Sequence, residues 1–211
     1  ADSYRFGWLR YGVDAPSSGN DLLLQIRHNA SRKLQLTMRY RYRNDFTSLR
    51  EEGNPMDRIT REDKWSGRIY LDYTSGPVEF RNAIEINQYT AKSTRTSGYA
   101  AWQDVGAQFS HLPLKFSMRY LVFNAPAYAN RIYTYESDVL HAFSSPSFSG
   151  KGSRIYLVAQ YAITGWIAVW IKASQVRYSD GRQQIGSGNE LIQGNKRTEF
   201  HILLRIKHRN H

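Results

Sequence analysis

Three arginines alternate with apolar and aromatic residues between Leu34 and Asn44, where the chain reads LQLTMRYRYRN. Side chains of an extended strand point alternately to opposite faces, so Arg39, Arg41 and Arg43 share one face. A packed core does not accept three guanidinium groups together, because each needs partners for its charge and its donors. We therefore expect the arginine face to be wet. If the opposite face meets lipid, the pattern is that of a transmembrane β-barrel strand that lines a water-filled lumen.

Arginines recur on the expected lumen faces of other segments. The candidate lumen-facing basic residues are Arg39, Arg41, Arg43, Arg68, Arg119, Arg154 and Arg205. Together they could form an interior that attracts anions. They could equally pair across neighbouring strands and stiffen a closed lumen, with Asp72, Glu79, Glu85 and Glu199 as partners. We favour the pairing, since polar barrel interiors are often filled by such networks.

Two further segments carry residue types that bind ions. Tyr133, Tyr135, Glu136 and Asp138 bring phenols and carboxylates together, and calcium prefers oxygen ligands. The EF-hand spacing is missing, however, and strand alternation explains the tyrosines, so we expect no metal there. The glycines of FSGKG lack the Lys-Ser/Thr pair and the helix of a phosphate-binding P-loop. We expect an ordinary loop between Phe143 and Ser153.

An outer-membrane hydrolase is the main enzymatic alternative. The six histidines are His28, His111, His141, His201, His208 and His211. Ser110 precedes His111 and Ser144 lies near His141, but adjacent strand residues face opposite ways, which separates Ser110 from a base at His111. No G-x-S-x-G elbow occurs. We expect no catalytic residue and no cofactor.

The elements that must position these side chains are strands. Alternation returns along the chain, as in Phe200, Ile202, Leu204 and Ile206, and no helical period competes with it. We predict an all-β fold, an antiparallel up-and-down transmembrane β-barrel. About eleven strands are expected, at Ser3–Val13, Asp21–Asn29, Lys33–Phe46, Lys64–Thr74, Val78–Thr90, Ser97–Ser110, Leu114–Asn124, Arg131–Phe143, Ser153–Ile163, Trp166–Tyr178 and Thr198–His208.

The connections between these strands alternate in length. Short ones are expected at Asn29–Lys33, Thr74–Val78, Ser110–Leu114 and Ile163–Trp166. Thr47–Asp63 and Ser179–Arg197 are long and rich in Gly, Asn and charge, and we expect both as exposed loops on one rim. Bacterial single-chain barrels have even strand numbers. Eleven therefore means either one miscounted strand or a sheet completed by residues outside this chain, and we favour the second explanation.

Composition agrees with this architecture. Aromatics make up 14% of the 211 residues, which form one expected barrel region over residues 1–211. The mean hydropathy of −0.60 looks soluble, but a barrel strand shows only half its residues to lipid. Zero cysteines fit an oxidising compartment and many others. No export signal opens the chain, so any signal has been removed or lies upstream. A soluble β-sandwich is the alternative fold.

The basic balance suggests a polyanionic partner. The formal charge is +11 and the isoelectric point is near 9.9, which invites a nucleic-acid interpretation. No zinc-finger spacing, RNP-like stretch or glycine-rich phosphate loop accompanies it. Basic side chains at a membrane surface equally meet anionic lipid headgroups.

Several stretches resemble one family of large Bacteroidetes proteins. Arg131–Ile163 reads RIYTYESDVLHAFSSPSFSGKGSRIYLVAQYAI, followed by WIAVWIKASQVRYSD and IGSGNELIQGNKRTEFHILLRIK. These are similar to the family's C-terminal β-rich region, as is SGYAAWQDVGAQFSHLPLKFSMRYLVFNAPAYANRIY upstream, so the resemblance covers roughly Trp65 to the end. Members carry a helix-hairpin-helix module, related to a competence DNA-binding protein, near their N-terminus. This chain has no such pattern. The resemblance implies the last part of a longer barrel.

Function is ranked in three classes. We predict a non-enzymatic integral β-barrel of the bacterial outer membrane, a subunit or scaffold of an assembly or transport complex. Its expected partners are membrane lipid, lipopolysaccharide and other outer-membrane or periplasmic proteins. A nucleic-acid uptake or binding barrel comes second, and an outer-membrane hydrolase third.

Overall fold

The main element of the fold is one antiparallel sheet. A computed structural model describes residues 1–8, 13, 16–49, 58–109 and 111–207. Ten strands pair in the order β1-β2-β3-β4-β5-β6-β7-β10-β11-β14, so that consecutive long strands are always neighbours. Their bounds are β1 Asp2–Phe6, β2 Ser17–Asn29, β3 Leu34–Leu49, β4 Arg58–Ser75, β5 Val78–Ala91, β6 Thr94–Gln108, β7 Leu114–Ala125, β10 Gly150–Ala162, β11 Ile167–Tyr178 and β14 Lys196–Ile206. The up-and-down meander expected from the alternation is confirmed.

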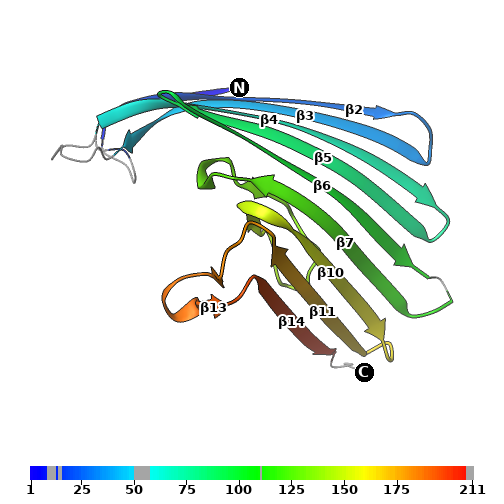
Figure 1. Cartoon of the computed structure of the whole chain (residues 1–211). Helices are drawn as coiled ribbons and strands as arrows, with labels where there is room; N and C mark the ends of the chain where they lie inside the picture. Colours follow the sequence, from blue (N-terminus) through cyan, green and yellow to red (C-terminus); the bar gives the residue numbers. More distant parts are fainter. Residues whose placement is uncertain (9–12, 14–15, 50–57, 110, 208–211) are drawn as a thin grey trace.

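The sheet curves around a hollow, and its two ends do not pair with each other (Figure 1). At one end, β1 covers only Ser17–Asp21 of β2, so residues 22–29 have no strand partner on that side among the described residues. At the other end, β14 pairs with β11 alone. The described sheet is therefore open, with two unpaired edges.

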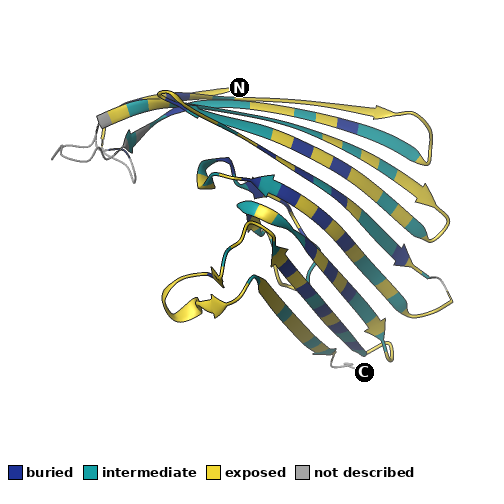
Figure 2. Cartoon of the chain, viewed as in Figure 1, coloured by how far each residue is buried: buried dark blue, intermediate teal, exposed yellow. Residues whose placement is uncertain are grey.

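The convex face carries a continuous apolar surface. One row of the register crosses six strands from β2 to β7 at Ile26, Met38, Ile69, Ile84, Ala101 and Val122. A second row crosses from β7 to β14 at Met118, Leu157, Ala173 and Phe200. Ile84 is 59% exposed and Ile202 is 74% exposed, and exposed and buried residues alternate along the strands in Figure 2.

The core lies on the concave face, under an insertion. Residues 126–149, called here the inward loop, connect β7 to β10 and include the 3-10 helix η1 (Tyr128–Asn130) and the short strands β8 (Ile132–Tyr133) and β9 (Ser147–Phe148). Ile132 and Phe148 from this loop join Trp102, Leu121 and Phe123 of the sheet in one buried apolar cluster. The inward loop thus covers the concave face of the sheet and contributes Ile132 and Phe148 to its apolar core.

The strand expected at Arg131–Phe143 is wrong, because this segment belongs to the inward loop. Its backbone is extended, but Thr134 and Glu136 donate to the carbonyls of Pro146 and Ser144, at 3.3 and 2.9 Å, and not to the main sheet. β7 pairs directly with β10. The odd count of eleven came from this segment, so it no longer points to strands outside the chain.

The rims differ as predicted, with one exception. The turns after β2, β4, β6 and β10 are short, whereas the connections after β1, β7 and β11 are longer. The turn from β5 to β6 has only two residues between the strands, although it lies on the long-loop rim. The expected loop 47–63 is shorter than predicted, because β3 continues to Leu49 and β4 begins at Arg58. Residues 50–57 lie outside the described residues. The loop shares a rim with loop 179–195, as predicted.

Loop 179–195 forms a small hairpin of its own. It contains β12 (Gln184–Ile185), the 3-10 helix η2 (Gly188–Glu190) and β13 (Ile192–Gln193). Near the start of this loop, Arg182 packs against the end of β11, with its guanidinium 3.7 Å from the centre of the Tyr178 ring. No helix in the described part of the chain is long and apolar enough to cross a membrane.

Candidate functional site

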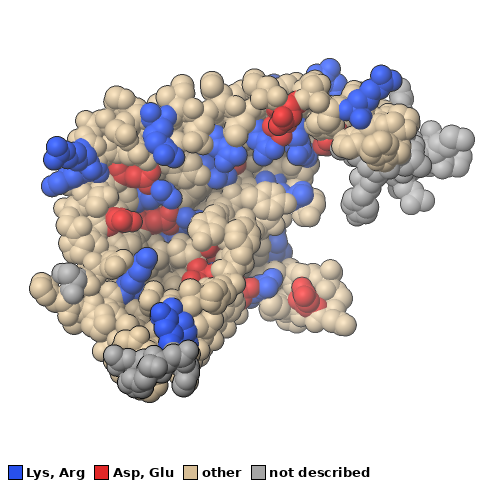
Figure 3. Space-filling view, turned by 180° about the vertical axis from the view of Figure 1, so that it is seen from behind, with Lys and Arg blue, Asp and Glu red and all other residues tan. Residues whose placement is uncertain are grey.

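Charged side chains gather on the concave face, in and around the hollow (Figure 3). The register places all seven candidate arginines on this face, from β3 (Arg39, Arg41, Arg43), β4 (Arg68), β7 (Arg119), β10 (Arg154) and β14 (Arg205). They do not form one site. Three are bound to the inward loop, whereas others line a cavity beside it.

Arg154 lies in a buried ion-pair network under the inward loop. Its Nε and Nη2 donate to the two carboxylate oxygens of Glu136, at 2.8 and 3.0 Å. Nη2 also lies 3.2 Å from Ser174 Oγ and 3.4 Å from a carboxylate oxygen of Glu199. Glu136 is fully buried, and Lys172 Nζ approaches it to 3.7 Å. A bidentate pair with these additional donors and acceptors fixes the loop against β10 and β11.

A second group of charges holds the next turn of the inward loop. Asp138 accepts a hydrogen bond from Lys172 Nζ at 2.8 Å, and its other oxygen lies 3.0 Å from Nδ1 of His201 on β14. The Lys172 side chain is 2% exposed. Two loop carboxylates therefore neutralise the buried cations of β10 and β11.

Arg68 and Arg119 bind the loop through its backbone. Arg68 donates to the carbonyl of Tyr133 at 2.9 Å and forms an ion pair with Glu85 on the neighbouring strand β5. Arg119 donates to the carbonyl of Tyr135 at 2.7 Å and forms a bidentate pair with Asp104, at 2.5 and 2.8 Å. Both guanidinium groups satisfy charge and donors at once, as a buried arginine requires.

Arg205 is held differently. Its guanidinium lies 4.9 Å from the centre of the Trp170 ring, in a cation–π contact, and its Nε has no hydrogen-bond partner among the described atoms.

A cavity of about 440 Å³ opens between the inward loop and strands β3, β4 and β5. Six cationic side chains and one carboxylate line it, and these are Arg39, Arg41, Arg43, Lys64, Arg68, Arg131 and Glu85. Tyr133 and Tyr135 lie on its loop side. The excess of positive charge makes this cavity the candidate binding site.

Only some of the carboxylates predicted to pair with the candidate arginines do so in the structure. Glu85 pairs with Arg68 and Glu199 with Arg154, but Asp72 pairs with Arg81, which was not a candidate. No described residue pairs with Glu79. Asp104 and the carboxylates of the inward loop were not predicted as arginine partners. Asp104 stands directly opposite Arg119, so this pair could be predicted from the sequence only if the register of β6 on β7 were known.

The other candidate sites have structural explanations. Glu136 and Asp138 are occupied by cationic side chains, while Tyr133 and Tyr135 point to the other side of the loop and are exposed. No cluster of three metal-ligating His, Asp or Glu residues occurs in the described part. The FSGKG glycines lie where β9 meets β10, so the strand begins at Gly150, earlier than expected.

The hydrolase candidates are scattered. His28 is on β2, His111 lies in a turn, His141 lies in the inward loop with a φ of 65°, and His201 contacts Asp138. Ser110, His208 and His211 lie outside the described residues. Among the residues that are described, no serine hydroxyl forms a hydrogen bond with a histidine ring.

Comparison with known proteins gives a weak structural likeness. No family model and no curated protein matches the chain. Among solved structures, the chain is similar to the Ralstonia pickettii toluene transporter TbuX, at 12% identity and a TM-score of 0.34. The match covers 91% of this chain and 69% of that chain. At this similarity it assigns neither a family nor an activity.

Proposed function

We propose that this chain is a β-barrel region of the bacterial outer membrane, a non-enzymatic subunit or scaffold of an assembly or transport complex. One observation carries the proposal: an exposed apolar convex face covers every long strand, while the charged residues in the middle of these strands lie on the concave face. Soluble monomers rarely expose a contiguous apolar surface larger than several hundred Å². A bilayer around the convex face and water in the hollow satisfy both sets of side chains.

Strand lengths agree with a membrane span. A tilted strand needs about 9–11 residues to cross the hydrocarbon core. β7, β10, β11 and β14 have 12, 13, 12 and 11 residues. β3 and β4 have 16 and 18 residues, and they extend beyond that length toward the long-loop rim.

The open edges support a larger barrel. In lipid every backbone N–H and C=O must be satisfied internally, because an unpaired edge costs several kcal/mol for each group. The free edges of β2 and β14 then need further strands. This agrees with what the resemblance implies, and we propose that the chain is the C-terminal β-rich part of a longer protein of the Bacteroidetes helix-hairpin-helix family, with lipid, lipopolysaccharide and envelope proteins as its partners.

The test uses two tryptophans on opposite faces. Trp65 of β4 stands opposite Tyr42 on the convex side, whereas Trp102 of β6 is 5% exposed and lies against Arg68 and Arg119. Single-tryptophan variants are reconstituted in vesicles of brominated phospholipid. We expect strong quenching of Trp65 fluorescence and little quenching of Trp102.

Two outcomes oppose the membrane assignment. A chain that is monodisperse without detergent, with neither tryptophan quenched, would instead be a soluble β-sandwich. Equal quenching of both tryptophans would contradict the assignment of faces.

A nucleic-acid uptake or binding barrel is the second candidate, and the cationic cavity is the observation that favours it. Phosphate contacts dominate the affinity of such proteins. The aromatic residues of the convex face would not contribute stacking, because they would lie in lipid.

A further inference from the structure

The cavity beside the inward loop has cations on two opposed walls. One wall is the concave face of β3 and β4, with Arg39, Arg41 and Arg43 at successive inward positions. The other wall is the inward loop, where the Arg131 guanidinium lies 4.0 Å from the centre of the Tyr128 ring and donates to the Tyr128 carbonyl at 3.0 Å. A ligand between them would meet positive charge from both sides.

The cations divide into partnered and unpartnered groups. Arg68 pairs with Glu85, Arg41 with Asp21, and Lys64 lies 3.3 Å from Glu62. Among the described residues, Arg39 and Arg43 have neither an ion pair nor a hydrogen bond. Both are only partly exposed, and the carboxylates that attract them, Glu85 for Arg39 and Asp21 for Arg43, are each already ion-paired with another arginine.

The register makes this charge excess costly. On β4, Arg39 stands directly opposite Arg68 and Arg43 directly opposite Lys64, whereas their cross-strand partners on β2 are Gln25 and Asp21. Like charges at such cross-strand positions destabilise a sheet. A bound anion would reduce this repulsion, because a guanidinium can donate two parallel hydrogen bonds to a phosphate or carboxylate.

Neutral donors are also available at the cavity wall. Asn130 of the inward loop is 3% exposed and lines the cavity, and its Nδ2 has no hydrogen-bond partner among the described atoms. A buried amide donor without a partner costs free energy. The phenols of Tyr133 and Tyr135 are further potential donors.

We propose that this cavity binds a small solute with several phosphate or carboxylate groups, held between Arg39 and Arg43 of β3 and Arg131 of the inward loop. Its volume of about 440 Å³ falls within the usual range for small-ligand sites, roughly 300–1,000 Å³. The inward loop bounds it, so a compact ligand fits better than a nucleic-acid strand. The inference rests on the proposed function only in requiring that the concave face be wet.

Isothermal titration of the detergent-purified chain with inorganic tripolyphosphate tests the site, and citrate forms the carboxylate arm. We expect saturable binding with one equivalent. The double variant Arg39→Ala/Arg43→Ala should weaken it at least tenfold. Lys115→Ala/Arg177→Ala removes the same charge from exposed residues of β7 and β11 outside the cavity and should bind as the parent does.

Other results have defined meanings. If anion binding is weakened equally in both double variants, the effect depends only on net charge and the proposed site is wrong. Non-saturable binding by the parent chain would also overturn the site. A single-stranded oligonucleotide that binds more tightly than tripolyphosphate and displaces it would assign the cavity to nucleic acid instead.

The more conservative double variant Arg39→Gln/Arg43→Gln controls for folding, as does the far-ultraviolet circular dichroism spectrum of each variant. If the parent chain shows no anion binding while its Trp65 quenching is intact, the site is overturned and the membrane proposal stands. Loss of Trp65 quenching overturns the membrane proposal and leaves the titration to be judged separately.

Discussion

At the scale of single residues, the inward loop depends most on Glu136, a fully buried carboxylate that serves Arg154 and Lys172. Glu136→Gln keeps the shape but leaves two buried cations short of a negative charge. Breaking a buried pair from one side costs about 3–5 kcal/mol. We expect a loss of this size in the free energy of unfolding, measured by denaturant titration in detergent. Glu190→Gln, an exposed residue of loop 179–195, is the control and should change little.

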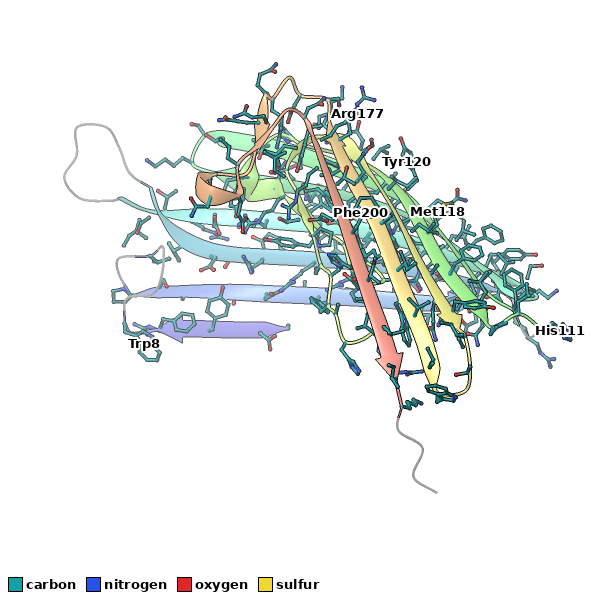
Figure 4. The ribbon with its side chains drawn as sticks, turned by 90° about the horizontal axis from the view of Figure 1, so that it is seen from below. Trp8, His111, Met118, Tyr120, Arg177 and Phe200 are labelled. Atoms are coloured by element: carbon teal, nitrogen blue, oxygen red, sulfur yellow. The ribbon has the colours of Figure 1, made fainter. Side chains whose placement is uncertain are left out.

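The two faces can be compared at adjacent positions of one strand. Met118 of β7 projects from the convex face, as do Tyr120 beside it and Phe200 of β14 (Figure 4), whereas Ser117 faces the hollow. If lipid surrounds the convex face, Met118→Arg should cost roughly 2–4 kcal/mol near the bilayer midplane. Ser117→Arg should cost much less. Refolding into vesicles at increasing urea measures both, and equal costs would contradict the assignment.

Asp180, just after β11, offers a pH test outside the strands. Hydrogen bonds from Arg182, with Nε to Oδ1 at 2.9 Å, and from the Lys151 amide at 3.3 Å lower the pKa of Asp180 to about 2. The carboxyl of an unfolded chain has a pKa of about 3.9. The folded pKa is the lower one, so this pair's stabilisation is complete above about pH 4 and is lost as the pH falls toward 2.

The carboxyl carbon shift of Asp180, followed by NMR, reports its titration directly. Removing the guanidinium with Arg182→Gln should move the midpoint up toward the unfolded value. An unchanged midpoint in that variant would show that Arg182 does not cause the shift.

At the scale of elements, the inward loop and the sheet are separable. Ala125 and Gly150 are cross-strand partners, so β7 and β10 need only a short turn between them. Replacing residues 127–148 with Asn-Gly should preserve the ten-strand sheet but uncover its concave face. The structure predicts a less stable protein, because Arg68, Arg119 and Arg154 each lose loop partners.

Thiol labelling measures how far the loop shields the hollow. The chain has no cysteine, so Ser174→Cys introduces a single thiol at a site that is 3% exposed. A water-soluble maleimide should react slowly with this variant and much faster once residues 127–148 are replaced. Similar rates would mean that the loop does not close this part of the hollow.

At the scale of the whole molecule, charge and apolar surface are separated. The net charge of +11 is concentrated away from the convex rows, and the paired arginines cannot contact a polyanion without losing their carboxylates. We expect weak, sequence-independent DNA binding, with dissociation constants of about 10⁻⁴–10⁻⁶ M near physiological salt.

A salt titration of single- and double-stranded DNA against the detergent-purified chain measures this. Affinity should fall steeply as salt increases. Tight binding that persists at high salt would favour the uptake function over the assembly or transport function.

The sequence by itself determined the sheet and its two faces. Alternation with period two is local, so strand ends such as Val78 of β5 and Leu114 of β7 were predicted to the residue, and Met38 and Arg39 were placed on opposite faces before any register was known. Short turns were equally readable, because Gly and Pro at 76–77 act on their immediate neighbours.

Only the tertiary structure decided how the hollow is filled. Ile132, Thr134 and Glu136 alternate with two tyrosines as a sheet strand would, and nothing local reveals that this segment folds inward. The pairing of Arg154 with Glu136 joins β10 to that loop, and the absence of a described partner for Arg39 follows from the register of β3 on β4. Each depends on contacts between distant segments, which the alternation within one segment does not encode.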